Sequence, residues 1–184
     1  MKKLKPIILR RSEPTEKDLK KIKRTPIYLV LDRIIDTYNI GSLFRLADAV
    51  AVEKMYLCGD MEYPPNSRVH KAAVGTEAWV PWEKTDTALE VIKRLRDQGV
   101  QIIAVEQSKQ SIDYRLLTKE LIRFPVAIIC GNETDGLSEE ILKEVDLIVE
   151  LPMLGINHSF NVWGTTAVIA YKILEFLTDE VTSS

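Results

Sequence analysis

Short apolar runs that alternate with helical patterns constrain the fold of this 184-residue chain more than any other feature. Because these runs stay apolar at every position, both faces of their sheet must be covered, as is typical of parallel sheets. We therefore predict an α/β fold built on a parallel sheet, with helices between the strands. The predicted strands lie at residues 27–32, 54–60, 100–106, 124–130 and 146–151.

Helical patterns fill most of the gaps between these strands, at residues 41–51, 86–99, 137–145 and 159–180. Gly99 suits the end of the second helix. The last pattern is apolar nearly all round, which is typical of a helix buried on both sides. Residues 61–83 show no regular pattern, so we predict either a substrate-facing loop or a poorly packed connection.

The net charge of -2 hides an asymmetry along the chain. Residues 1–25 contain ten Lys or Arg and three Asp or Glu, whereas the remaining chain contains 15 basic and 24 acidic residues. This pattern favours a partner that carries phosphates, such as nucleic acid, although a solvated terminal helix would have the same composition. We therefore expect a basic N-terminal extension at 1–25 and one folded domain at 26–184.

The two cysteines, Cys58 and Cys130, lie in apolar runs, and no CxxC motif or Cys/His cluster occurs. This favours free thiols in a reducing, cytoplasmic location, and it predicts neither a zinc site nor another metal site. No apolar run approaches the ~18 residues that a membrane span needs, so we expect no membrane partner.

Three polar segments each follow a predicted strand, where parallel sheets bind their ligands. In the first, TYNIGSLFRLADA, Asn39 is a good helix N-cap, and Gly41 allows another backbone or a ligand to approach. Arg45 lies beside apolar side chains and must find a partner, which is either Asp48 one turn on or a ligand.

The other two segments leave the same choice between local structure and ligand binding. ICGNETDGLSEE begins at Gly131 and is either a backbone cradle for a ligand or a turn with an acidic helix cap. In LPMLGINHSFNVWGTTA, Ser159 is a plausible N-cap and Asn161 lies in the first turn, yet both could contact a substrate. No Walker A, GxGxxG or Ser-His-Asp set is present, and we expect His70 and His158 to be surface or structural residues.

Taken in order, the three segments resemble the motifs of the SpoU (TrmH-like) family of RNA 2′-O-ribose methyltransferases, a branch of the SPOUT enzymes. The resemblance covers roughly residues 26–178. It implies a deep C-terminal trefoil knot, an exception to the rule against knots. It also implies an S-adenosylmethionine pocket formed by the knot, and a homodimer with the final helix at its interface. Phe160 and Trp163 depart from the pattern, which usually has Leu and a small residue there.

The resemblance also implies two sets of site residues. The catalytic set is Arg45, Asn39, Glu133, Ser159 and Asn161. The cofactor-binding set is Val105, Glu106, Gly131, Leu151, Met153 and Phe160. Because a guanidinium does not give up its proton readily and makes a poor base, we expect Arg45 to clamp a phosphate, and a twofold dimer lets it complete the partner's site.

The function expected from the resemblance is methyl transfer from S-adenosylmethionine to a ribose 2′-hydroxyl of RNA. Only ~25 residues precede the first strand, too few for a separate RNA-binding domain, which favours tRNA over rRNA. The basic extension, Arg68 and Lys71 would then carry much of the RNA contact. The alternatives are a catalytically silent RNA-binding protein, a small-molecule α/β enzyme that uses a nucleotide, and methyl transfer to a base.

Overall fold

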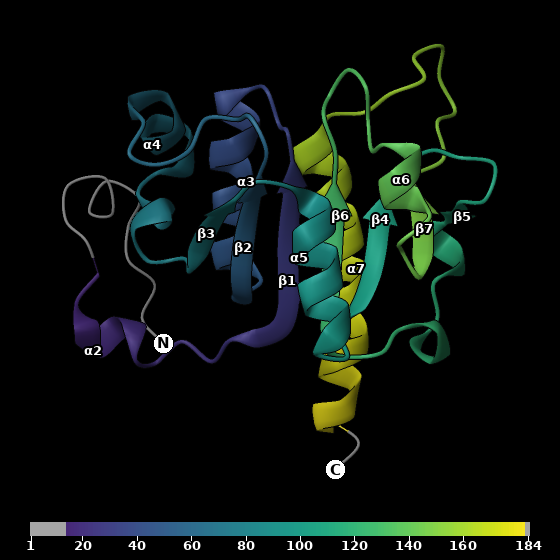
Figure 1. Ribbon diagram of the computed structural model, residues 1–184. Coiled ribbons are helices and arrows are strands. Elements are labelled where there is room, and N and C mark those ends of the chain that lie inside the picture. The colour runs from purple at the N-terminus through teal and green to yellow at the C-terminus, as the bar shows by residue number, and fades with distance from the viewer. Residues whose placement is uncertain (1–13, 183–184) are drawn as a thin grey trace.

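A seven-stranded sheet in the order β3-β2-β1-β6-β4-β7-β5 forms the centre of the protein (Figure 1). The computed structural model describes residues 14–182. All six strand pairings are parallel, which confirms the predicted α/β fold. The first 13 residues of the predicted basic extension lie outside the described residues.

All five predicted strands and all four predicted helices are present, with shifted ends. The strands are β1 (Thr25–Asp32), β2 (Val52–Cys58), β3 (Trp82–Thr85), β4 (Gln101–Val105), β5 (Ile112–Asp113), β6 (Val126–Cys130) and β7 (Leu147–Glu150). The α-helices are α2 (Glu16–Leu19), α3 (Thr37–Ala49), α4 (Ser67–Ala73), α5 (Ala88–Asp97), α6 (Glu139–Leu142) and α7 (Val162–Thr182). Short 3₁₀ turns occupy Thr76–Ala78, Tyr114–Leu116 and Lys119–Leu121.

The prediction of an irregular stretch at 61–83 was wrong, because it contains α4 and the start of β3. The Asn66 side chain caps α4 by accepting from the backbone N–H groups of Arg68 (2.9 Å) and Val69 (3.1 Å). A seven-residue helix shows too few turns for its period to stand out in the sequence.

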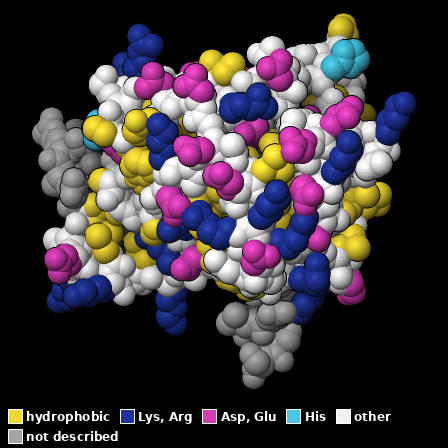
Figure 2. Space-filling view, viewed as in Figure 1, with side chains coloured by type: hydrophobic (Ala, Val, Ile, Leu, Met, Phe, Trp, Pro, Cys, Tyr) yellow, Lys and Arg dark blue, Asp and Glu magenta, His cyan; other side chains and the backbone are white. Residues whose placement is uncertain are grey.

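Side chains of each central strand alternate between two apolar cores, which is why the strands read as continuous apolar runs. In β1, Leu29 and Leu31 pack on the side of α3 and α7, while Val30 packs on the side of α5. Figure 1 shows α5 and α6 in front of the sheet with α3 and α7 behind it. On the front face, Lys/Arg and Asp/Glu side chains lie interspersed (Figure 2).

Gly41 brings α3 and α4 into direct contact. A Cβ at this position would lie 2.5 Å from the Ala72 Cβ and 2.7 Å from the Ala73 backbone nitrogen. The predicted close approach is therefore made by the α4 backbone, which fixes α4 beside the carboxyl end of the sheet.

Helix α7 packs against α3, β4 and β6 at the back of the sheet. The predicted knot, in which the chain after β7 passes through a loop, is consistent with this order of strands and stays a prediction. Among residues 14–182, no helix is long and apolar enough to cross a membrane.

Candidate functional site

A pocket of about 710 Å³ opens where β1, β4, β6 and β7 end. Its walls come from residues 35–39, 105–107, 131–136 and 150–165, so each wall follows a different strand. The volume lies within the ~300–1,000 Å³ that small-molecule sites usually have.

Ten of the eleven predicted site residues line this pocket. The lining includes Asn39, Val105, Glu106, Gly131, Glu133, Leu151, Met153, Ser159, Phe160 and Asn161. Arg45 is the exception: its side chain is exposed on the outer side of α3 and does not contribute to the pocket wall.

Glu133 ties the loop after β6 to the start of α3. Its carboxylate accepts hydrogen bonds from the backbone N–H groups of Ile35 (2.8 Å) and Asp36 (3.0 Å), and from the Asn39 side chain (2.8 Å). Burial acts to raise the pKa of Glu133, but these three donors outweigh it and hold the pKa below its ordinary value. Glu133 is therefore an ionised carboxylate fixed by hydrogen bonds, and it is poorly suited to act as a general base.

Asn39 extends the same network to the last segment. Its carbonyl oxygen accepts from the Asn161 side-chain amide at 3.0 Å, and the Asn161 oxygen accepts from the Trp163 backbone N–H at 3.0 Å. One chain of hydrogen bonds thus joins all three motifs. Both the nitrogen and the oxygen of the Asn39 side-chain amide take part in it.

Both predicted helix caps were wrong. Asp36 caps α3 by accepting from the Tyr38 N–H, which leaves Asn39 inside the first turn with its side chain free to bridge the loops. Asn161, directly before α7, accepts from Trp163, whereas the Ser159 N–H donates to Asn157 at 3.3 Å.

Glu106 links the loop after β4 to the loop after β6. Its carboxylate accepts from the Leu137 N–H (2.8 Å) and the Gln107 N–H (2.9 Å). The Gln107 side chain in turn donates to the His158 backbone carbonyl at 2.9 Å. Gly131 also packs closely against the chain at Leu137, because a Cβ on Gly131 would lie 2.7 Å from the Leu137 nitrogen.

The pocket wall is strongly acidic. Its carboxylates belong to Asp36, Glu106, Glu133, Asp135 and Glu150. No Lys, Arg or His occurs among the described lining residues. Such a wall suits a ligand with positive charge and disfavours a phosphate-rich one.

Arg45 has no ion pair or hydrogen bond within the described part of the chain. Its expected local partner, Asp48, instead accepts from the Trp79 indole N–H at 2.6 Å. The predicted salt bridge is therefore absent from the described residues, and the guanidinium points to solvent.

Sequence reasoning missed several pocket residues, notably Gln107, Glu150 and Thr165. Gln107 lies just after β4, and Glu150 is the last residue of β7. The rule that ligands bind at the carboxyl ends of parallel strands could therefore have found both. Thr165 lies on the first turn of α7, and the mostly apolar pattern of this helix did not single it out.

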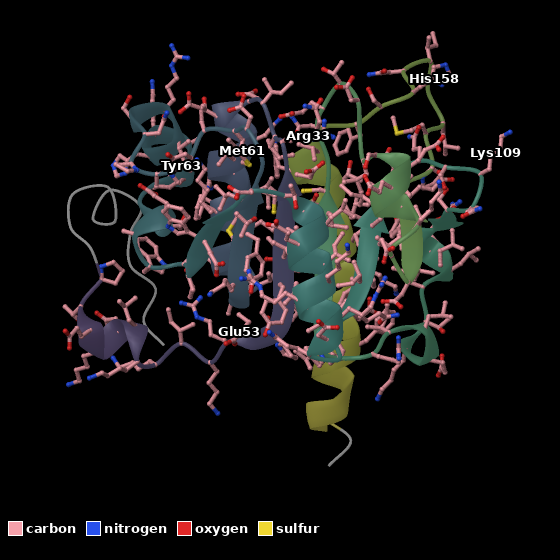
Figure 3. The ribbon with its side chains drawn as sticks, viewed as in Figure 1. Arg33, Glu53, Met61, Tyr63, Lys109 and His158 are labelled. Carbon is pink, nitrogen blue, oxygen red and sulfur yellow. The ribbon has the colours of Figure 1, made fainter. Side chains whose placement is uncertain are left out.

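Neither histidine lines the pocket. His70 pairs with Glu77 on the surface, and Figure 3 shows His158 at the tip of the loop before α7. Both cysteines are buried free thiols. Within residues 14–182, no group of three or more His, Cys, Asp or Glu is placed to hold a metal ion.

Known proteins resemble this chain in sequence and in fold. The tRNA (guanosine(18)-2′-O)-methyltransferase of Escherichia coli K12 is 29% identical over 154 residues, which is 82% of this chain and 64% of that protein. This chain therefore spans less than two thirds of that relative.

Two crystal structures share the fold. The A. aeolicus TrmH/SpoU tRNA modifying enzyme has a TM-score of 0.78 at 27% identity, over 90% of this chain and 85% of that one. The AdoMet-bound rRNA methyltransferase from Sinorhizobium meliloti has a TM-score of 0.76 at 26% identity, over 93% and 68%. The model of the SpoU rRNA Methylase family matches residues 26–171. The chain belongs to the SpoU rRNA Methylase family.

Proposed function

We propose that this protein transfers a methyl group from S-adenosylmethionine to a ribose 2′-hydroxyl of tRNA. The observation that carries the proposal is the acidic pocket in which all three motifs meet through Glu133, Asn39 and Asn161. The names of the E. coli and A. aeolicus relatives support tRNA. Similarity to the S. meliloti enzyme makes rRNA the second candidate substrate.

The pocket fits the proposed cofactor in charge and in surface. A sulfonium and an ammonium group match its carboxylates, and Val105, Leu151, Met153 and Phe160 offer apolar surface for an adenine ring. Glu106 and Gly131 would hold the cofactor loops together. When bound, this cofactor supplies a methyl group on a positively charged sulfur, which an oxygen nucleophile can attack.

The described residues divide into positioning groups and groups free to meet the substrate. Glu133, Asn39 and Asn161 are occupied by each other, so they would hold the loops in place. The exposed Ser159 hydroxyl lines the pocket and has no partner among the described side chains, so it is available to a ribose. Orientation of this kind can supply much of a rate enhancement.

Arg45 would reach a pocket only in a dimer. It lies six residues beyond Asn39 on α3, which is about 9 Å along the helix axis. On α7, which packs beside α3, Val168 and Tyr171 are 37% and 52% exposed, so an apolar face is available for a second copy. In a twofold dimer Arg45 would enter the partner's pocket, clamp the RNA phosphate and stabilise developing negative charge.

A mixing experiment tests this arrangement. Arg45→Ala removes the clamp, and Met153→Trp fills the pocket; each variant alone should be inactive. Heterodimers would pair one intact pocket with one intact Arg45, so a mixture should recover about a quarter of wild-type activity. Full inactivity of heterodimers verified by two affinity tags would place Arg45 in the site of its own chain, and activity of Arg45→Ala alone would place it outside the reaction.

The reaction itself is tested with methyl-tritiated S-adenosylmethionine and separate pools of unmodified tRNA and rRNA. A 2′-O-methylated nucleoside from tRNA is the expected product. Label only in rRNA would favour the second candidate. Absence of label together with absence of cofactor binding by calorimetry would favour a silent RNA-binding protein.

The basic extension is proposed to bind RNA phosphates outside the pocket, because ten of its 25 residues are Lys or Arg. Deletion of residues 1–24 should weaken RNA binding and flatten its salt dependence. The free thiols and the RNA-modifying relatives together support a cytoplasmic location.

A further inference from the structure

Residues 152–160, which we call the β7–α7 loop, form one wall of the acidic pocket but bury little of their own surface. Asn157 and Ser159 of this loop line the pocket. Leu154 and Ile156 are 91% and 98% exposed. Because an exposed apolar side chain gains little from packing, burial does not fix the middle of this loop, and its position depends on other contacts.

One hydrogen bond joins the β7–α7 loop to another segment of the described chain. The Gln107 side-chain nitrogen donates it to the His158 backbone carbonyl at 2.9 Å. Figure 3 shows His158 and Lys109, which follows Gln107 in the same loop, on the same upper right side of the molecule. No other hydrogen bond from residues 14–151 or 161–182 reaches this loop, so the Gln107 amide is the contact that can hold it beside the pocket.

Gln107 is itself held in place by Glu106. The Gln107 backbone N–H donates to Oε1 of Glu106 at 2.9 Å, and Oε2 accepts from the Leu137 N–H at 2.8 Å. A Cβ on Gly136 would collide with this carboxylate, so Glu106 has little room to move. A relay of hydrogen bonds therefore runs from the loop after β6, through Glu106 and Gln107, to the β7–α7 loop.

The two ends of this relay meet different parts of the pocket. Glu106 and Gln107 line it where β4 ends, and the β7–α7 loop lines it beyond β7, the neighbouring strand. A hydrogen bond between them fixes the width of the pocket at this point. Because a backbone carbonyl only accepts, the residue at position 107 must supply a donor for this contact to form.

We propose that Gln107 is a positioning residue for S-adenosylmethionine, and that it holds the β7–α7 loop in the arrangement that binds the cofactor. This inference rests on the proposed function. Without the hydrogen bond, the loop would lie beside the pocket in a smaller fraction of the molecules, and the apparent affinity falls with that fraction. At saturating cofactor the loop is in place in nearly every molecule, so turnover should change little.

The test replaces Gln107 with methionine, which has nearly the same length and no donor. Calorimetry should show that the Kd for S-adenosylmethionine rises about threefold to tenfold, the range expected for one neutral hydrogen bond. The KM for S-adenosylmethionine should rise by a similar factor, while kcat and the KM for RNA stay within about twofold of wild type. Gln110→Met, an exposed change in the same loop but outside the pocket lining, is the matched control and should behave as wild type.

A nitroxide label measures the order of the loop directly. The label is attached through Ile156→Cys, because this position is 98% exposed and both natural cysteines are buried. Adding Gln107→Met should make the label more mobile in its electron paramagnetic resonance spectrum, and saturating S-adenosylmethionine should remove the difference. A lower free energy of unfolding in urea with unchanged label mobility would mean that Gln107 only stabilises the fold, and would overturn the proposal.

The remaining outcomes separate this inference from the proposed function. If wild type binds S-adenosylmethionine and Gln107→Met binds it equally well, the role of Gln107 is overturned and methyl transfer is left standing. A rise in the KM for RNA alone would make Gln107 an RNA contact and would overturn the proposal as well. No binding of S-adenosylmethionine by wild type would contradict the proposed function itself and this inference with it.

Discussion

The side chain of Asn39 donates a 2.8 Å hydrogen bond to Glu133, 94 residues further along the chain. The same side chain accepts from Asn161, 122 residues away. Because these contacts join segments that follow three different strands, the pocket exists only when all three are correctly placed. Their removal is therefore expected to affect ligand affinity and stability together.

Glu133→Ala should lower the free energy of unfolding by about 1–3 kcal/mol, because it leaves three hydrogen-bond donors without their charged acceptor. It should also weaken binding of S-adenosylmethionine, since the loop after β6 loses its anchor. Urea unfolding and calorimetry measure the two effects. Glu140→Ala, an exposed carboxylate on α6 outside the pocket lining, is the matched control; equal losses in both variants would show that the contacts of Glu133 are not the cause.

The Glu133 anchor should also depend on pH. Its pKa in the folded protein lies below the ordinary value of about 4.3, because the three donors outweigh burial. A group with a lowered pKa contributes stability that is fully present above the unfolded value and is lost as pH falls through the folded pKa. The stability difference between wild type and Glu133→Gln should therefore shrink as urea titrations move from pH 6 to pH 3. A difference that stays constant over this range would contradict the lowered pKa.

Gly41→Ala should destabilise the protein by about 1–3 kcal/mol, the usual cost of overpacking. Its Cβ would lie 2.7 Å from both the Ala73 nitrogen and the Val69 oxygen, and backbone atoms of a packed helix have little room to move. Gly155→Ala is the control, because a Cβ there meets nothing within 4 Å. Thermal unfolding of the two variants gives the comparison, and similar melting temperatures would mean that α4 can shift freely.

The order of elements could be predicted from sequence because a parallel sheet covered on both faces forces apolar runs. Helix α4 and strands β3 and β5 were missed because short elements held by capping and edge pairing leave little periodic signal. Ten of the eleven residues that the motif resemblance named line the pocket, and Arg45 does not. It could not show that Asn39 bridges two loops instead of capping α3, because capping depends on the backbone angle at Asp36.

The position of Arg45 illustrates a second limit. Its sequence spacing from Asn39 shows only that the two lie on one helix, so the sequence left a pairing with Asp48 open. In the structure Asp48 accepts a hydrogen bond from Trp79, and Arg45 is exposed on the surface. In the proposed dimer Arg45 would act on the partner's site, and the periodicity of one chain cannot place such a residue.

Phe160 and Gly164 form a pair that should tune the cofactor pocket. A Cβ on Gly164 would lie 2.7 Å from the Phe160 ring, and Phe160 is 59% exposed, so the ring can move without disturbing the core. Gly164→Ala should therefore change stability little but push the ring and alter the affinity for S-adenosylmethionine severalfold.

The double variant Phe160→Leu with Gly164→Ala tests this coupling, because the smaller side chain relieves the clash. The effects of the two single changes on the affinity for S-adenosylmethionine should therefore not add. The affinity of the double variant should lie closer to that of Phe160→Leu alone than the sum of the two effects would give. Calorimetric dissociation constants for the four proteins complete the cycle. Strict additivity would show that Gly164 is small for another reason, such as the packing of α7 in a dimer.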